Sequence, residues 1–153
     1  MLSSFYKERR KIDMSKNDCI FCKIIEGKLP SSKVYEDDDV VAFLDISQTT
    51  VGHTLVVSKA HYDNFLTAPK EIMHKVMDVA QRIGQAQIMM LGAKGVNILS
   101  NVNEEAGQSV KHFHVHVIPR YISGEGFQIT MKDNPKANEL SLPTLAEEIK
   151  RGL

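Results

Sequence analysis

The chain of 153 residues is long enough for one domain with its own hydrophobic core. Its 19 lysines and arginines balance its 19 aspartates and glutamates, which excludes a general electrostatic attraction to nucleic-acid polymers or membranes. No apolar run reaches transmembrane length, and no apolar stretch follows the polar, basic start as it would in a secretory signal. We therefore expect a cytoplasmic protein.

Residues 1–17 are predicted to be a disordered extension, with Met14 as a candidate true start. The first apolar segment follows and holds the only two cysteines, Cys19 and Cys22. A reducing cytoplasm argues against a disulfide, and no strand precedes the pair as a thioredoxin-like motif requires. We interpret the pair as half of a zinc site, and two buried thiols without a metal are the alternative.

A domain is predicted over residues 18–127. Its first half predicts a short helix at 20–26 and three strands at 34–36, 40–44 and 53–57. A long helix follows, opened by Pro69, with Thr67 as a candidate capping residue. The apolar stripe of this helix consists of Ile72, Val76, Val79, Ala80, Ile83 and Ile88. Its methionines are interpreted as core filler and are Met73, Met77, Met89 and Met90.

The second half predicts strands at 96–99 and 111–118 with a loop at 101–109 between them. A polar tail, 128–153, carries a short helix at 145–151. Strands in consecutive pairs around one long helix predict an α+β fold. Its core would be an antiparallel β-sheet meander with the long helix on one face.

Three histidines, His112, His114 and His116, occupy every second position of the strand at 111–118. Alternate side chains of a strand share a face, so the imidazoles line one face and the apolar residues between them bury the other. A single histidine is usually an ordinary polar residue, but three in alternation indicate a function. At about 3.3 Å per residue, His112 and His116 lie roughly 13 Å apart, too far for one zinc ion. We expect the three to divide their roles.

The segment Gly107-Gln108-Ser109 precedes the first of these histidines by three residues. Glycine lets the backbone approach a ligand, and the two polar side chains add hydrogen-bond donors. Alone, this segment is no more than a turn. Beside three imidazoles it predicts a phosphate-binding loop.

Together these motifs resemble the histidine triad family of nucleotide hydrolases and transferases. The resemblance covers about residues 18–121 and includes Asp45-Ile46-Ser47, Gly52 to Val57 and Asn101. It implies that His114 is the nucleophile, which attacks the α-phosphorus and forms a nucleotidyl-histidine intermediate. His116 would contact the phosphate, and His53 would support it from a neighbouring strand.

The resemblance also implies contacts with the nucleotide. Asn101, Gly107, Gln108 and Ser109 would contact the phosphate and leaving group, with Ser109 counted in the catalytic set, and Asp45 would bind the ribose hydroxyls. Five residues would form an apolar slot for the base, with plain core packing as the alternative: Ile20, Phe21, Ile24, Phe43 and Ile46.

Bacterial members that resemble this chain carry zinc on two cysteines, a histidine after the third strand and the first triad histidine. The matching residues are Cys19, Cys22, His61 and His112. They imply one structural zinc per chain.

The function expected is hydrolysis of nucleoside phosphoramidates, with purines preferred, by a homodimer. The alternative is a dinucleoside polyphosphate hydrolase of the same family, which the ending Ile118-Pro119-Arg120 and Lys111 favour, whereas Ser109 favours the phosphoramidase. A non-catalytic nucleotide-binding scaffold and a metallohydrolase with zinc-activated water stay open. The intact His116 argues against the uridylyltransferase branch.

Overall fold

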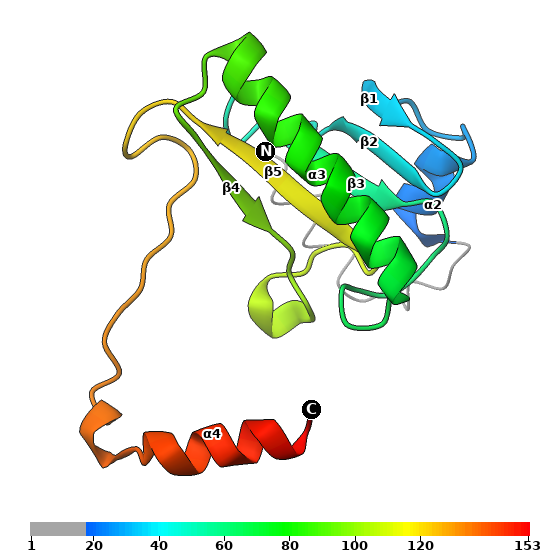
Figure 1. The fold of residues 1–153 in the computed structure, drawn as a ribbon. Helices are drawn as coiled ribbons and strands as arrows, with labels where there is room; N and C mark the ends of the chain where they lie inside the picture. The colour runs from blue at the N-terminus through cyan, green and yellow to red at the C-terminus, as the bar shows by residue number, and fades with distance from the viewer. Residues whose placement is uncertain (1–17) are drawn as a thin grey trace.

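A five-stranded antiparallel sheet forms the centre of the computed structural model, which describes residues 18–153 (Figure 1). The predicted extension, 1–17, lies outside the described residues. The elements are α2 Ile20–Ile25, β1 Lys33–Glu36, β2 Val40–Leu44, β3 Thr54–Ser58, α3 Lys70–Leu91, β4 Gly95–Leu99, η3 Glu104–Ala106, β5 His114–Arg120, η4 Ala137–Glu139 and α4 Leu142–Arg151. The α+β prediction is confirmed.

The strand order is β1-β2-β3-β5-β4, and every neighbouring pair is antiparallel. The last two strands therefore exchange places relative to chain order. β5 becomes an inner strand with hydrogen-bonded partners on both sides, and β4 becomes an edge.

The alternation from Phe113 into β5 buries one set of apolar residues, as the sequence predicts, and it separates two hydrophobic clusters. Phe113, Val115 and Val117 are fully buried in the cluster beneath α3. The other face is covered by α2, and there Phe21 and Phe43 belong to a second cluster. The histidines lie on this second face.

The prediction that Thr67 caps the long helix is wrong. α3 begins at Lys70 with Pro69 as its N-cap, and Pro69 makes no side-chain cap hydrogen bond. The Thr67 hydroxyl instead donates to the Asn64 carbonyl oxygen at 3.1 Å and accepts from the Asn64 N–H at 3.1 Å. The hydroxyl that a helix cap would require is therefore already hydrogen-bonded within a local turn.

The prediction that the methionines of α3 fill the core holds only for Met73, which is partly buried. Met77, Met89 and Met90 are exposed, and so is Ile88. Only one side of this 22-residue helix lies on the sheet, so residues on its other sides stay in solvent. None of the helices in residues 18–153 is both long and apolar enough to cross a membrane.

Several element boundaries differ from the predicted ones, and three of the starts matter most. β3 begins at Thr54 instead of residue 53, α4 at Leu142 instead of 145, and β5 at His114 instead of 111. His112 precedes β5, and its backbone N–H donates to the Val110 carbonyl oxygen at 2.9 Å instead of joining the sheet. His112 therefore lies in a loop at the end of the histidine strand.

Gly84→Ala is expected to stabilise the fold. Gly84 is buried in α3, and an added Cβ would meet Val96 at 3.7 Å and Val117 at 3.8 Å, which are ordinary van der Waals contacts. Glycine inside a helix costs about 0.5–1 kcal/mol relative to alanine, so urea unfolding should show a gain of that size. Gly126→Ala is the contrasting control, since its Cβ would clash with the Thr49 carbonyl oxygen. A destabilised Gly84→Ala protein would contradict the packing of α3 described here.

Candidate functional site

Four side chains with metal-binding atoms converge where α2 meets the start of β5. Cys19 caps α2, Cys22 lies within it, His61 follows β3 and His112 precedes β5. The Cys19 Sγ and His112 Nδ1 atoms are 3.3 Å apart, and so are the Cys22 Sγ and His61 Nδ1 atoms. All four ligand atoms lie within 4.8 Å of one another. The structure thus brings together the predicted zinc ligands.

The geometry of this cluster fits a zinc ion. Ligands with bonds of about 2.0–2.3 Å around one zinc lie roughly 3.3–3.8 Å apart. Four of the pairs in this cluster are separated by 3.1–3.5 Å, and all lie within 4.8 Å. The Nε2 atom of His112 lies 2.6 Å from the Ser58 carbonyl oxygen, so the proton is on Nε2 and the Nδ1 lone pair faces the cluster. Burial lowers the pKa of His112 to about 4, which keeps this imidazole neutral as a ligand requires. These four residues form a candidate metal site.

A backbone carbonyl orients the ring of His114. The Nδ1 atom lies 2.6 Å from the His112 carbonyl oxygen, which can only accept, so Nδ1–H donates and Nε2 keeps its lone pair. Within the described residues, no hydrogen bond reaches Nε2. The ring packs edge-on against Phe21 and His116 at centroid distances of 5.0 Å. Burial lowers the pKa of His114, so the arrangement supplies a neutral imidazole with one free lone pair.

His53, which directly precedes β3, and His116 of β5 form a hydrogen-bonded pair. The His53 Nε2 and His116 Nδ1 atoms are 2.9 Å apart. The other nitrogen of His53, Nδ1, is buried and has no partner among the described residues. A buried N–H without a partner is rarer than a bare acceptor, so we place the proton on His53 Nε2, where it is donated to His116. The remaining Nε2–H of His116 is then a free donor.

Burial also lowers the pKa of both members of this pair, to about 4 for His116. Asp45 borders the pair, with its Oδ2 atom 3.7 Å from His53 Nε2. The Asp45 Oδ1 atom accepts from the backbone N–H of Ser47 at 2.8 Å and from its hydroxyl at 2.7 Å. One oxygen of the carboxylate is therefore held by its own loop, while the other faces the histidines.

The predicted phosphate loop contains both structural and accessible residues. Gln108 is buried, and its side-chain amide makes three hydrogen bonds of 2.6–3.0 Å to backbone groups. Asn101 donates to the Gly107 carbonyl oxygen at 3.3 Å, and Gly107 has a φ of +91° that favours glycine. Ser109 is exposed. The Gln108 side chain therefore holds the loop in place. In the segment 107–109, the side chain that is open to a ligand is that of Ser109.

The five residues predicted to hold a base fall into two groups. Phe21 and Phe43 are buried, with their rings edge to face at 5.7 Å, so the core-packing alternative describes them. Ile20 and Ile24 are partly buried against the same cluster, and Ile46 is largely exposed. The three isoleucines are the members of this set with surface left for a ligand.

Sequence reasoning missed the groups that orient the histidines and Asp45. The Ser58 carbonyl oxygen holds His112, and Ser47 holds Asp45. No motif could reveal the first contact, because it depends on how β3 meets the end of the histidine strand. The second could have been found, since a serine two residues after an aspartate is a common local turn partner.

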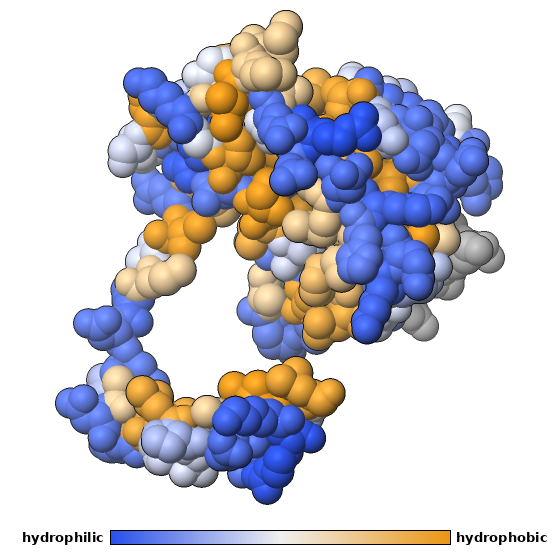
Figure 2. Space-filling model, viewed as in Figure 1, coloured by the Kyte–Doolittle hydropathy of each residue, from blue (hydrophilic) through white to orange (hydrophobic). Residues whose placement is uncertain are grey.

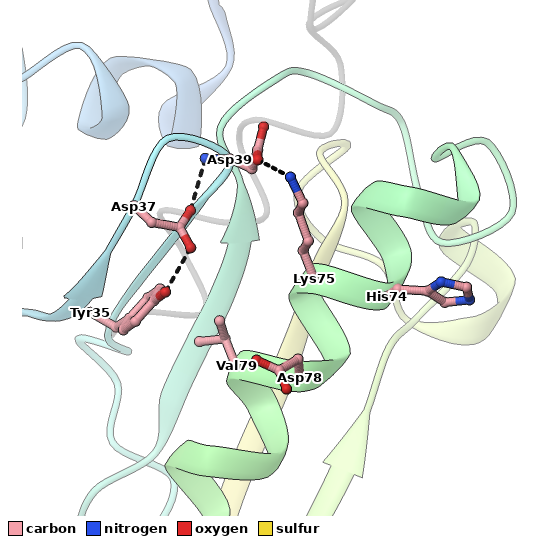
Figure 3. Close-up of a pocket in the computed structure, with 7 residues that line it drawn as sticks. All are labelled: Tyr35, Asp37, Asp39, His74, Lys75, Asp78 and Val79. Carbon is pink, nitrogen blue, oxygen red and sulfur yellow. Dashed lines mark hydrogen bonds and ion pairs between the residues drawn. The ribbon is translucent and has the colours of Figure 1, made fainter.

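A second polar cluster lies on the other face of the sheet, beside α3 (Figure 3). It lines a surface hollow of about 340 Å³. Tyr35 donates to Asp37 at 2.6 Å and Lys75 pairs with Asp39, while His74 points away from them (Figure 3). The contacts tie the turn between β1 and β2 to α3, so we assign this cluster a structural role.

Comparisons with known proteins agree with this geometry. The family model described as the HIT domain matches residues 26–123. The protein named hit from Bacillus subtilis is 49% identical over 115 residues, covering 75% of this chain and 79% of the relative. An Arabidopsis thaliana protein named adenylylsulfatase HINT3 is 38% identical over 104 residues, covering 68% of this chain and 53% of the relative.

Solved structures give the same result. The crystal structure of a HIT family protein from Bacillus anthracis has a TM-score of 0.83 and 43% identity, covering 90% of this chain and 98% of that chain. A zinc-bound histidine triad family protein from Mycobacterium smegmatis has a TM-score of 0.70 and 33% identity, covering 90% and 99%. The chain belongs to the HIT family of histidine triad nucleotide hydrolases and transferases.

Proposed function

We propose that this protein hydrolyses nucleoside phosphoramidates, with purine nucleosides preferred, by attack of His114 on the α-phosphorus. The 2.6 Å hydrogen bond from His114 Nδ1 to the His112 carbonyl oxygen carries the proposal. It leaves Nε2 with a lone pair and no competing partner among the described residues. A neutral, oriented imidazole is the form in which histidine acts as a nucleophile.

The reaction proceeds in two displacements. The Nε2 lone pair forms a bond to phosphorus as the P–N bond of the substrate breaks, and the amine leaves with a proton from solvent that the exposed Ser109 hydroxyl relays. Water then attacks phosphorus, the bond to Nε2 breaks, and the nucleoside monophosphate is released. Covalent catalysis of this kind replaces one difficult step by two easier ones.

The surrounding residues bind the substrate. The free Nε2–H of His116, held in place by His53, donates to a phosphoryl oxygen on which charge develops. Asn101 and the Gly107–Ser109 backbone contact the same phosphate. The Asp45 oxygen that Ser47 leaves free accepts from the ribose hydroxyls, and the three isoleucines border the base.

The features that favour a dinucleoside polyphosphate have other partners in the structure. Arg120 donates to Asn97 at 2.8 Å and to Glu125 at 3.2 Å. Lys111 is paired with Asp63 at 3.7 Å. Within the described residues, no hydrogen bond or ion pair joins Arg120 or Lys111 to the histidines, whereas Ser109 is exposed. This distribution favours the phosphoramidate.

We assign the metal site a structural zinc, one per chain. Cys19, Cys22, His61 and His112 would hold it. When bound, the ion supplies a cross-link between α2, the loop after β3 and the start of β5, and no step of the reaction passes through it.

The proposal includes a homodimer. Family resemblance supports it, and so does β4, an edge strand on which Ile98 is exposed. An open edge with exposed apolar residues is a surface that proteins usually cover. The cytoplasmic location remains a prediction.

His114→Ala is expected to abolish turnover of adenosine 5′-phosphoramidate, with a loss of roughly 10³-fold or more, while adenosine monophosphate still binds. The assay compares initial rates on this substrate, diadenosine tetraphosphate and adenylyl sulfate, with the phosphoramidate expected to be fastest for the unmodified protein. His74→Ala is the matched control, since His74 is an exposed histidine of α3. A His114→Ala rate within tenfold of the unmodified protein would exclude a covalent role for this residue.

Asp45→Ala is expected to raise KM for a ribonucleoside substrate far more than for its 2′,3′-dideoxy analogue. The carboxylate can gain hydrogen bonds from the diol only where the diol exists. Steady-state kinetics on the two substrates measure the difference. An equal rise for both would show that Asp45 acts through His53 or Ser47 and does not bind the ribose.

Elemental analysis of protein purified without added metal should find one zinc per chain. Because the ligands are assembled only in the folded state, chelation should lower Tm more than it lowers turnover measured well below Tm. Cys22→Ser should lose the metal and His74→Ala should keep it. A metal-free protein with both native thiols freely titratable would reassign Cys19 and Cys22 to core packing.

A further inference from the structure

The C-terminal tail has no packing partner among residues 18–153, the part of the chain that the structure describes. Every residue from 128 to 153 is exposed. From residue 129 onward, the hydrogen bonds and ion pairs found in the described chain join residues no more than four apart. The tail leaves the sheet after β5, and α4 lies apart from the domain (Figure 1).

α4 is nevertheless a well-formed amphipathic helix. Ser141 caps it by accepting from the Thr144 N–H, and Leu142, Leu145 and Ile149 form one stripe at i, i+3 and i+7. These side chains are 70%, 44% and 68% exposed. Figure 2 shows the apolar surface along one side of α4 and polar surface along the other. A ten-residue helix is marginal by itself in water, so packing of this stripe must stabilise it.

The domain carries an apolar groove that suits such a helix. It lies between α3 and the nearby ends of β1, β2 and β3, and its volume is about 610 Å³. Met90 and Leu91, whose exposure the core does not explain, form part of its wall. Other apolar residues of the wall are Val34, Leu44, Val51 and Ile83.

We propose that α4 of one copy docks its Leu142, Leu145 and Ile149 stripe into the α3 groove of a second copy of this chain, so that two chains exchange tails. An i, i+3, i+7 set of apolar anchors is the usual pattern of a helix bound in a groove. The exchange buries both exposed surfaces with residues that the chain itself supplies. It rests on the proposed homodimer and is independent of the proposed chemistry.

The course of the tail favours a second copy over the groove of the same chain. Tyr121 donates to the Val51 carbonyl oxygen at 2.6 Å, which anchors the root of the tail at the rim of its own groove. From this anchor the tail runs away from that groove (Figure 1). Ile129 and Met131 lie on its extended part and are exposed too, so the apolar surface continues along the path toward a neighbour.

The charges of α4 argue against a membrane as the occupant. Its polar side holds Glu147 and Glu148 against Lys150 and Arg151, whereas helices that lie on anionic lipid are rich in lysine and arginine.

Disulfide trapping tests the exchange in the full-length protein. Chains with Leu145→Cys are mixed with chains carrying Met90→Cys, allowed to exchange subunits and oxidised, and linked peptides are identified by mass spectrometry. We expect at least tenfold more of this cross-link than from Glu147→Cys mixed with Met90→Cys, because residue 147 lies on the opposite side of α4. An equal yield would overturn the proposal. So would a double variant, Leu145→Cys with Met90→Cys, that closes its disulfide within one chain.

Self-association gives a second measurement. Leu145→Asp with Ile149→Asp should raise the dimer Kd at least tenfold in sedimentation experiments, and Glu147→Gln should leave it unchanged. An unchanged Kd for the double variant would overturn the exchange but keep the homodimer, and a monomer for the unmodified chain would overturn both. Sedimentation of the unmodified chain with phosphatidylcholine–phosphatidylserine vesicles, lost in Leu145→Asp, would assign the stripe to a membrane instead.

Discussion

The alternation of side chains along β5 is the constraint on which the rest of the molecule depends. One set, Phe113, Val115 and Val117, is fully buried under α3, and the set between them carries the imidazoles to the face covered by α2. A slip of one residue in the pairing of β5 would move every side chain to the wrong face. Hydrogen bonding to β3 and β4 on both sides resists such a slip. The register that builds the core thereby also fixes the histidines.

His112 connects the two sites on that face. Its ring nitrogen Nδ1 faces the cysteines, while its carbonyl oxygen accepts from His114 and fixes which nitrogen of that ring is free. The two contacts use different parts of one residue. Pairing of β5 begins at His114, so the sheet holds the chain next to this carbonyl whether or not the ring binds a metal. A structural metal and a nucleophile can therefore be neighbours while the ion stays outside the reaction.

Local pattern predicted the elements well, because each depends on residues close in sequence. The bounds of β2 are those expected, and the alternation of the histidines survives in three dimensions. Features that depend on distant segments were missed. The position of β5 between β3 and β4, the inward turn of Gln108 toward the Asp63 carbonyl oxygen and the Ser58 contact of His112 all depend on chain pairing. The exposure of Met89 and Met90 depends on how much of α3 the sheet covers.

Those exposed methionines and the tail helix share one physical reason. An amphipathic pattern indicates that a face will be buried, but it does not say which surface buries it. In α3 the apolar pattern extends beyond the part of the helix that the sheet covers, and in α4 no surface of the described residues of the same chain covers the stripe. Apolar area left in water on both elements costs free energy that a single copy does not recover. In the proposed tail exchange, a second copy would supply the same two surfaces, so association would recover for the pair what each chain alone leaves exposed.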